Sequence, residues 1–173
     1  LTERDNERFR DLIRSEPYQT LWGKGFQLVK DGAVKITNDK TGWKLASSVG
    51  GVGTGERGDR VLLDDLHNVK DILSEVVMPE TNRWLRESVM NRLNNMDTSV
   101  IVSIGQRVHE DDSSNAMIEN GMLDCHLMIP MEYDPGRHCS TPIGWEDPRT
   151  EEGELAWSAR FPDRVVDGLK RDL

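Results

Sequence analysis

The sequence predicts a mixed α/β fold with a mostly parallel sheet. Two short runs with apolar centres, at residues 60–63 and 99–104, are typical of short buried strands. A helical pattern over residues 69–95 separates them. Strand, helix and strand in this order are the components of a βαβ crossover, which joins parallel neighbours. A further short strand is predicted at residues 126–130.

A helix and a β-hairpin region are predicted ahead of this crossover. Residues 3–15 place Phe9, Leu12 and Ile13 on one helical face, and Pro17 is expected to end the helix. Short strand-like runs follow at residues 26–29, 33–36 and 43–46. The turn-forming residues between these runs predict hairpin connections.

The remaining helices are predicted from periodicity and from proline. Pro79 suits the first turn of the amphipathic part of the 69–95 segment. Shorter helices are predicted at residues 113–123 and 165–173. Residues 132–173 are richer in Pro, Gly and charge, so we expect residues 1–131 to form the main domain and residues 132–173 a peripheral segment.

Composition excludes several classes of protein. The 173 residues carry 22 Lys and Arg against 31 Asp and Glu, a net charge of −9. This acidic balance disfavours a free-standing nucleic-acid binder, which needs clustered cations. No apolar run approaches the roughly 18 residues of a membrane span, and no secretory signal opens the chain. Two cysteines, Cys125 and Cys139, are typical of a reduced cytosolic protein.

Asp64 and Asp65 directly follow the first predicted crossover strand. Ligands of open α/β sheets bind at the carboxyl ends of parallel strands, where these acids are expected to lie. In nucleotide hydrolases, the first acid of such a pair holds Mg²⁺ and the second polarises the attacking water. The alternative interpretation is an ordinary strand end, capped by aspartates before the next helix.

A polar segment, residues 103–112, follows the second crossover strand. It is expected to leave the sheet at the same edge as Asp64 and Asp65. A polar side chain in this position can sense the γ-phosphate and pass its presence or loss to a neighbouring element. The alternative is a solvated loop that caps the helix predicted at residues 113–123.

The glycine-rich segment Gly50–Gly55 is predicted to be a flexible turn. A phosphate-binding P-loop needs the pattern GxxxxGK[ST], and no Lys-Ser or Lys-Thr pair occurs here. A dinucleotide-binding loop is also disfavoured, because a strand rather than a helix follows. The sequence therefore contains no Walker A motif.

Two further clusters were considered as metal sites. Cys125-His126 and His138-Cys139 offer four zinc ligands, but adjacent ligand pairs fit a tetrahedral site poorly. Three consecutive acids, Glu110–Asp112, point in different directions, whereas a two-metal site needs acids that converge from separate elements. An acidic helix start is the preferred interpretation of these acids.

Taken in order, several segments resemble the large terminase subunit of tailed bacteriophages, the motor that packages viral DNA. The similarity spans nearly the whole chain and rests on the ordered set rather than on any single motif. The segments that carry it are residues 10–23, 50–55, 61–67, 106–112, 147–157 and 160–162.

The resemblance implies part of a RecA-like (ASCE) P-loop NTPase domain. Residues 1–131 match the middle and end of the family's ATPase domain, and residues 132–173 match the segment towards its nuclease. The family's Walker A residues would lie before Leu1 and its nuclease acids beyond Leu173. We therefore expect residues 1–173 alone to hydrolyse no ATP.

The resemblance also implies roles for single residues. Asp64 matches the Walker B acid that engages Mg²⁺-ATP, and Asp65 matches the catalytic acid. Gln106 and Arg107 match the motif that couples hydrolysis to movement. The family's recurring His-Glu-Asp-Asp pattern, whose role the resemblance does not assign, includes His109 and Asp112.

The implied partners are double-stranded DNA, a portal protein, the small terminase subunit and further copies of the motor, in the host bacterial cytoplasm. Two other functions stay open. One is a catalytically inactive prophage remnant that serves as a protein-interaction module, with acids that only cap structure. The other is a metal-dependent nuclease in its own right, which the lack of converging acids disfavours.

Overall fold

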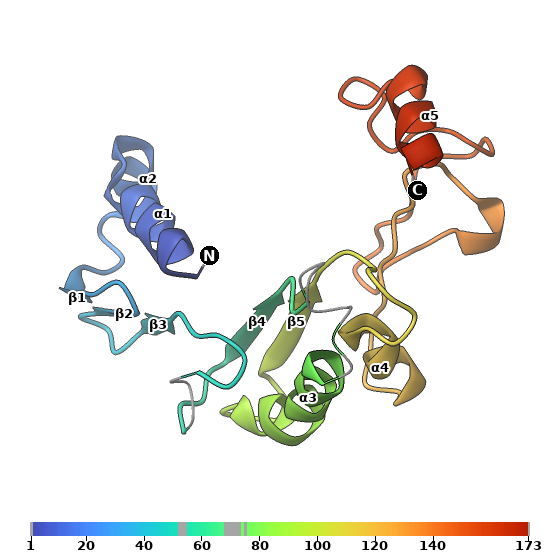
Figure 1. The fold of residues 1–173 in the computed structure, drawn as a ribbon. Coiled ribbons are helices and arrows are strands. Elements are labelled where there is room, and N and C mark those ends of the chain that lie inside the picture. Colours follow the sequence, from blue (N-terminus) through green and yellow to red (C-terminus); the bar gives the residue numbers. More distant parts are fainter. Residues whose placement is uncertain (1, 52–54, 68–73, 75, 173) are drawn as a thin grey trace. The chain divides into compact units, whose positions relative to one another are not determined.

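The computed structural model describes residues 2–51, 55–67, 74 and 76–172, and its backbone is shown in Figure 1. The chain forms two compact units, Leu1–Ala116 and Met117–Leu173. Both helices and strands are present, so the predicted mixed α/β class is confirmed. The domain boundary predicted between residues 131 and 132 lies inside the second unit and stays a prediction.

The first unit begins with two helices, α1 (Thr2–Arg14) and α2 (Glu16–Trp22). The helix predicted at residues 3–15 is confirmed, but Leu12 is 59% exposed and does not belong to its inner face. The prediction for Pro17 is wrong in part: the chain resumes as α2, with Pro17 in its first turn and Ser15 as its N-cap. Proline fits the first turn because its missing N–H would have no helical partner there.

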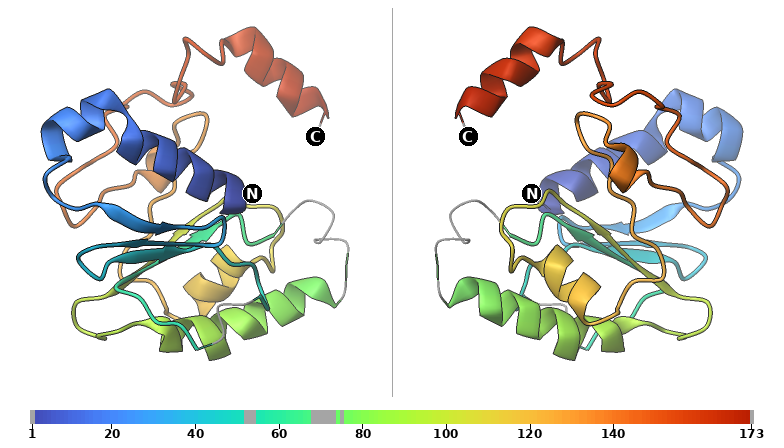
Figure 2. Two further views of the ribbon diagram at one scale, coloured as in Figure 1. Left: turned by 90° about the vertical axis from the view of Figure 1, so that its left-hand side faces the viewer. Right: turned by 90° about the vertical axis from the view of Figure 1, so that its right-hand side faces the viewer.

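The predicted hairpin region is an antiparallel sheet of three strands, β1 (Leu28–Asp31), β2 (Lys35–Asn38) and β3 (Trp43–Leu45). Figure 2 shows α1 lying across this sheet. Asn6 of α1 is fully buried, and its Nδ2 donates to the carbonyl oxygens of Ala33 (2.8 Å) and Val34 (3.1 Å). Lys44 Nζ donates to Asn6 Oδ1, so one polar side chain joins the helix to β3 and to the turn before β2.

The predicted parallel pair is confirmed as β4 (Arg60–Asp64) and β5 (Val100–Ile104). Between them lie α3 (Val77–Trp84), a π-helical turn (Leu85–Val89) and a 3-10 turn (Met90–Arg92). These segments run beside the strand pair in Figure 2. Pro79 occupies the first turn of α3, as predicted, whereas residues 68–73 and 75 of the predicted 69–95 helix lie outside the described residues.

The core between these elements is apolar. Leu63 of β4 is buried, as are Leu85, Val89 and Leu93 of the segment that follows α3. Among the described residues, the parallel arrangement comprises two strands, which is less than the mostly parallel sheet that the sequence predicts. A RecA-like arrangement stays a prediction.

The helix predicted at residues 113–123 is shorter, α4 (Ser113–Glu119), and spans the division between the two units. The second unit ends in α5 (Asp163–Asp172), which confirms the predicted C-terminal helix. The strand predicted at residues 126–130 is wrong, because that segment has no regular structure. The Arg149 guanidinium donates hydrogen bonds to the carbonyl oxygens of Pro130 (3.0 Å) and Met131 (3.4 Å), which a neighbouring strand would otherwise use.

Within the described ranges, no helix has both the length and the apolar character needed to cross a membrane.

Candidate functional site

The two predicted acids lie at the carboxyl end of β4. Asp64 is the last residue of the strand and is opposite Ile104 in the parallel register. The Asp65 N–H donates to the Ile104 carbonyl oxygen (2.9 Å), which continues the ladder by one residue. Both acids are exposed. The parallel pairing therefore positions two carboxylates at the edge where α/β sheets bind ligands.

Asp65 has an unusual backbone conformation. Its φ is 42°, in the left-handed region that non-glycine residues seldom occupy. Such conformations cost energy and are concentrated at functional sites. Here the conformation occurs directly after β4 ends, at the position of the second acid.

The segment after β5 passes beside this acid. A Cβ atom added at Gly105 would lie 3.6 Å from Asp65 Oδ1, an ordinary contact distance, so the two residues are neighbours. Gln106 follows and is exposed. The structure thus brings together the two strand ends that the sequence predicts to be neighbours. The roles assigned to Asp64, Asp65 and Gln106 stay predictions.

Asp112 organises the loop after β5. It is 1% exposed, and its Oδ2 accepts hydrogen bonds from Arg107 Nε (3.0 Å) and from the Val108 N–H (3.0 Å). Its Oδ1 accepts from the Asn115 N–H (3.0 Å), which makes Asp112 the N-cap of α4. Burial is the strongest single influence on the Asp112 pKa and acts to raise it, but the hydrogen bonds together lower it below the ordinary value.

Arg107 and His109 belong to the same loop. Arg107 Nη2 donates to the His109 carbonyl oxygen (3.3 Å), in addition to the bond from Nε to Asp112. The ring Nδ1 of His109 accepts from the Asp111 N–H (3.0 Å). In this structure the Arg107 guanidinium is therefore held by its own loop, and Asp112 has a structural role that the family pattern did not assign.

Sequence reasoning missed His67 as a site residue. Its side chain is 7% exposed, and its Nε2 accepts a hydrogen bond from the Ser113 N–H (3.1 Å). The ring Nδ1 is buried and has no hydrogen-bond partner in the part of the chain that the structure describes. The one feature of the sequence that could have indicated His67 is its position two residues after the acid pair, in the segment 61–67 that carries the resemblance.

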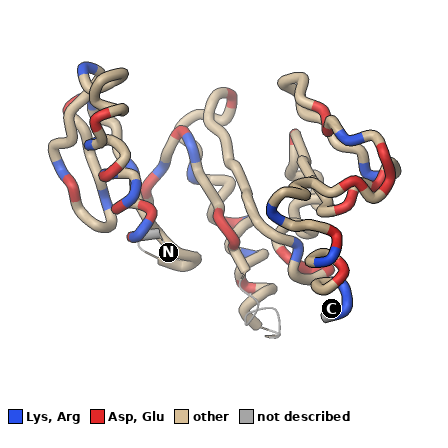
Figure 3. Tube along the Cα trace, turned by 90° about the horizontal axis from the view of Figure 1, so that it is seen from above, with Lys and Arg blue, Asp and Glu red and all other residues tan. Residues whose placement is uncertain are grey.

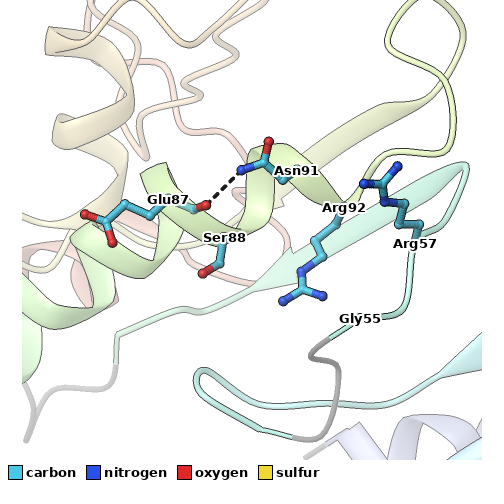
Figure 4. Close-up of a pocket in the computed structure, with 6 residues that line it drawn as sticks. All are labelled: Gly55, Arg57, Glu87, Ser88, Asn91 and Arg92. Atoms are coloured by element: carbon cyan, nitrogen blue, oxygen red, sulfur yellow. Dashed lines mark hydrogen bonds between the residues drawn. The ribbon is translucent and has the colours of Figure 1, made fainter.

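The structure has a cavity of about 310 Å³ away from the acids. It is lined by Gly55, Arg57, Glu87, Ser88, Asn91 and Arg92 (Figure 4). Two of these lining residues are joined by a hydrogen bond from Asn91 Nδ2 to the Glu87 carbonyl oxygen (2.9 Å). Gly58 pairs with Leu93 just before β4 begins, so this cavity lies towards the amino ends of the strands. It is a separate feature from the carboxylate site.

A second cavity, of about 290 Å³, lies beside the loop after β5. Met78, Pro79, Asn82 and Arg86 line it together with Asp111. Asn82 Nδ2 donates to the Asp111 carbonyl oxygen (2.9 Å), which ties α3 to this loop. Neither Asp64 nor Asp65 lines either cavity.

The residues suit magnesium better than a metal held by protein alone. Within the described ranges, no three His, Cys, Asp or Glu side chains are grouped so as to hold a metal ion. Magnesium usually takes one or two carboxylates and completes its shell with water and phosphate oxygens. Asp64 and Asp65 supply this number of carboxylates, and a role for them in holding Mg²⁺ stays a prediction.

The Cys and His residues considered for zinc have other surroundings. His138 Nδ1 is 2.9 Å from the Tyr133 hydroxyl oxygen. Cys139 is buried and Cys125 is exposed. Lys and Arg are interspersed with Asp and Glu along the chain (Figure 3).

No protein-family model matches the chain, and no curated protein or solved structure is significantly similar to it.

Proposed function

We propose that this chain is the ATPase segment of a phage terminase large subunit, which drives double-stranded viral DNA into a capsid. One observation carries the proposal. Asp64 and Asp65 lie at the carboxyl end of β4, beside the segment that leaves its parallel neighbour β5. The choice of family comes from the sequence segments that resemble terminase segments in the same order.

Phosphoryl transfer needs positioning and charge neutralisation more than covalent chemistry from the protein. Asp64 would hold Mg²⁺, which when bound neutralises charge on the phosphate oxygens. Asp65 would accept a hydrogen bond from the attacking water and orient it. The left-handed backbone of Asp65, a conformation that is concentrated at functional sites, supports a separate role for the second acid.

The same proposal includes the partners that the resemblance implies. These are double-stranded DNA, a portal protein, the small terminase subunit and further copies of the motor, in the bacterial cytoplasm. Gln106 and Arg107 would couple hydrolysis to movement. For Arg107, this requires the guanidinium to exchange its bond to Asp112 for one towards the nucleotide.

A specific observation favours the second candidate, a protein-interaction module. One face of the strand pair exposes four apolar side chains between Arg60 and Asp64: Leu62 is 67% exposed and Ile104 is 63% exposed, with Val100 and Val102 beside them. Parallel strands are normally covered on both faces. A partner chain could supply that cover without any hydrolysis.

Measuring ATP hydrolysis by the full-length protein, with double-stranded DNA present, separates the two candidates. We expect turnover that requires Mg²⁺, stops when EDTA removes the metal and returns when excess Mg²⁺ is added. Residues 1–173 alone should show none, because the phosphate-binding loop is not among them. A folded full-length protein that hydrolyses no ATP with Mg²⁺ and DNA present would favour the interaction module.

A further inference from the structure

His67 links the two strand ends of the candidate site. Among the described residues, two hydrogen bonds join the segment after β4 to the last residue of β5 and to the segment beyond it. One is from the Asp65 N–H to the Ile104 carbonyl oxygen (2.9 Å). The other is from the Ser113 N–H to His67 Nε2 (3.1 Å), and it is buried. A buried hydrogen bond is shielded from competing water and holds its partners in a fixed arrangement.

The far end of this link reaches the loop that carries Arg107. Ser113 follows Asp112, whose carboxylate accepts hydrogen bonds from Arg107 and from the Val108 N–H. A movement of Ser113 therefore displaces the group that holds Arg107. At the near end, His67 is two residues beyond Asp65, with its side chain 7% exposed, so the segment after the acids has little freedom to move alone.

The direction of the bond fixes the chemical form of the ring. A backbone N–H can only donate, so Nε2 must carry a lone pair and no proton. In the neutral ring the proton then lies on Nδ1, which is the buried nitrogen without a partner among the described residues. A leucine in this place would keep most of the volume and lose the acceptor. A glutamine would return an acceptor at about the position of Nε2.

We infer that His67 is a positioning residue that makes the acid-bearing end of β4 and the Arg107 loop move together, so that the state of the nucleotide site reaches Arg107. This inference rests on the proposed function and extends it, because it assigns the physical connection between Asp65 and Arg107 to a side chain outside the acid pair. His67 needs no contact with nucleotide for this role.

The test compares His67→Leu with His67→Gln in the full-length protein. We expect His67→Leu to lower kcat for ATP about tenfold, with little change in KM, because positioning rather than binding is lost. His67→Gln should restore most of kcat. Amide exchange at Ser113 should quicken in the leucine variant and slow again in the glutamine variant. The exposed His126, changed to Leu, is the control and should alter neither measurement.

Each outcome decides a different claim. Unchanged exchange at Ser113 in His67→Leu overturns the link itself. Unchanged kcat in that variant, while Asp65→Asn is inactive, overturns the role of His67 in turnover and leaves the proposed function standing. Full activity of Asp65→Asn removes the proposed function and this inference with it. If His67→Leu does not fold, the ring tautomer measured by nitrogen NMR in the unaltered protein decides, and a proton on Nε2 contradicts the link.

Discussion

Replacing Asp65 by Asn is expected to lower kcat for ATP hydrolysis by about 10²- to 10⁴-fold, the usual loss when a positioned acid–base group is removed. KM for ATP should change little, because Asp65 orients water rather than nucleotide in this mechanism. Asparagine is the informative replacement. It keeps the size of the side chain and is among the few residues that tolerate a φ of 42°.

An alanine at residue 65 would mix two effects, because it removes the carboxylate and strains the turn. The matched control is Asp97→Asn, an exposed acid that precedes β5 at the opposite end of the strand pair. It should leave kcat unchanged. If Asp65→Asn kept normal turnover in steady-state assays, Asp65 would have no part in the mechanism.

Replacing Arg149 by Lys is expected to loosen the second unit. Arg149 and Asp147 are both buried, and the guanidinium donates to both carboxylate oxygens, from Nε to Oδ1 (3.0 Å) and from Nη2 to Oδ2 (2.8 Å). Its Nη1 also donates to the carbonyl oxygens of Pro130 and Glu154. Lysine keeps the charge but cannot form this fork, so these partly buried carbonyl groups lose their donor.

Limited proteolysis under native conditions measures the effect. We expect cleavage within residues 117–172 to become at least about tenfold faster in Arg149→Lys, because local opening becomes more frequent. The control is Arg137→Lys, whose pair with Asp134 (3.5 Å) is exposed and should matter little. Equal cleavage rates in the two variants would show that the buried pair does not hold this unit together.

The same pair makes the second unit sensitive to acid. The hydrogen bond from Arg149 lowers the pKa of Asp147 below its ordinary value of 3.8. A carboxyl group with a lowered pKa stabilises the fold fully above that ordinary value, and this stabilisation is lost as the pH falls through the lower folded-state pKa. Cleavage within residues 117–172 should therefore become faster as the pH falls below the ordinary value of 3.8.

The parallel pair could be predicted because its signal is local. Residues 61–63 and 100–102 are short apolar runs, and a segment of the length of a crossover connects them. The place of Asp64 and Asp65 followed directly, since the end of a strand fixes the edge at which its last residues lie. The meeting of Asp65 with Gly105 needed no more than this register.

What failed depended on contacts between distant residues. The apolar run at residues 126–130 is typical of a strand, but the carbonyl oxygen of its last residue, Pro130, accepts a hydrogen bond from Arg149 instead of from a sheet partner. The buried face of α1 includes Asn6, which no hydrophobic pattern selects, because its amide satisfies carbonyl groups of a turn far along the chain. Periodicity alone cannot identify a polar residue that is buried for this reason.

The structural roles of residues in the loop after β5 could not be predicted from the sequence for a related reason. Asp112 was one of three consecutive acids, and only the folded loop distinguishes it, through four donors that converge on one buried carboxylate. His67 likewise gained its partner, Ser113, from the pairing of β4 with β5. A sequence shows which residues are present near a strand end but not which of them are fixed by hydrogen bonds.

Mapping the bound metal tests the proposed site most directly. Fe²⁺ in place of Mg²⁺, with ATP, ascorbate and peroxide, cuts the backbone close to where the metal is bound, and mass spectrometry locates the cuts. We expect ATP-dependent cleavage of the full-length protein within residues 64–66 and 104–107, and its loss in Asp64→Asn. Cleavage centred instead on the cavity beside Arg57 and Arg92, or cleavage that Asp64→Asn does not reduce, would contradict a nucleotide-metal site at the end of β4.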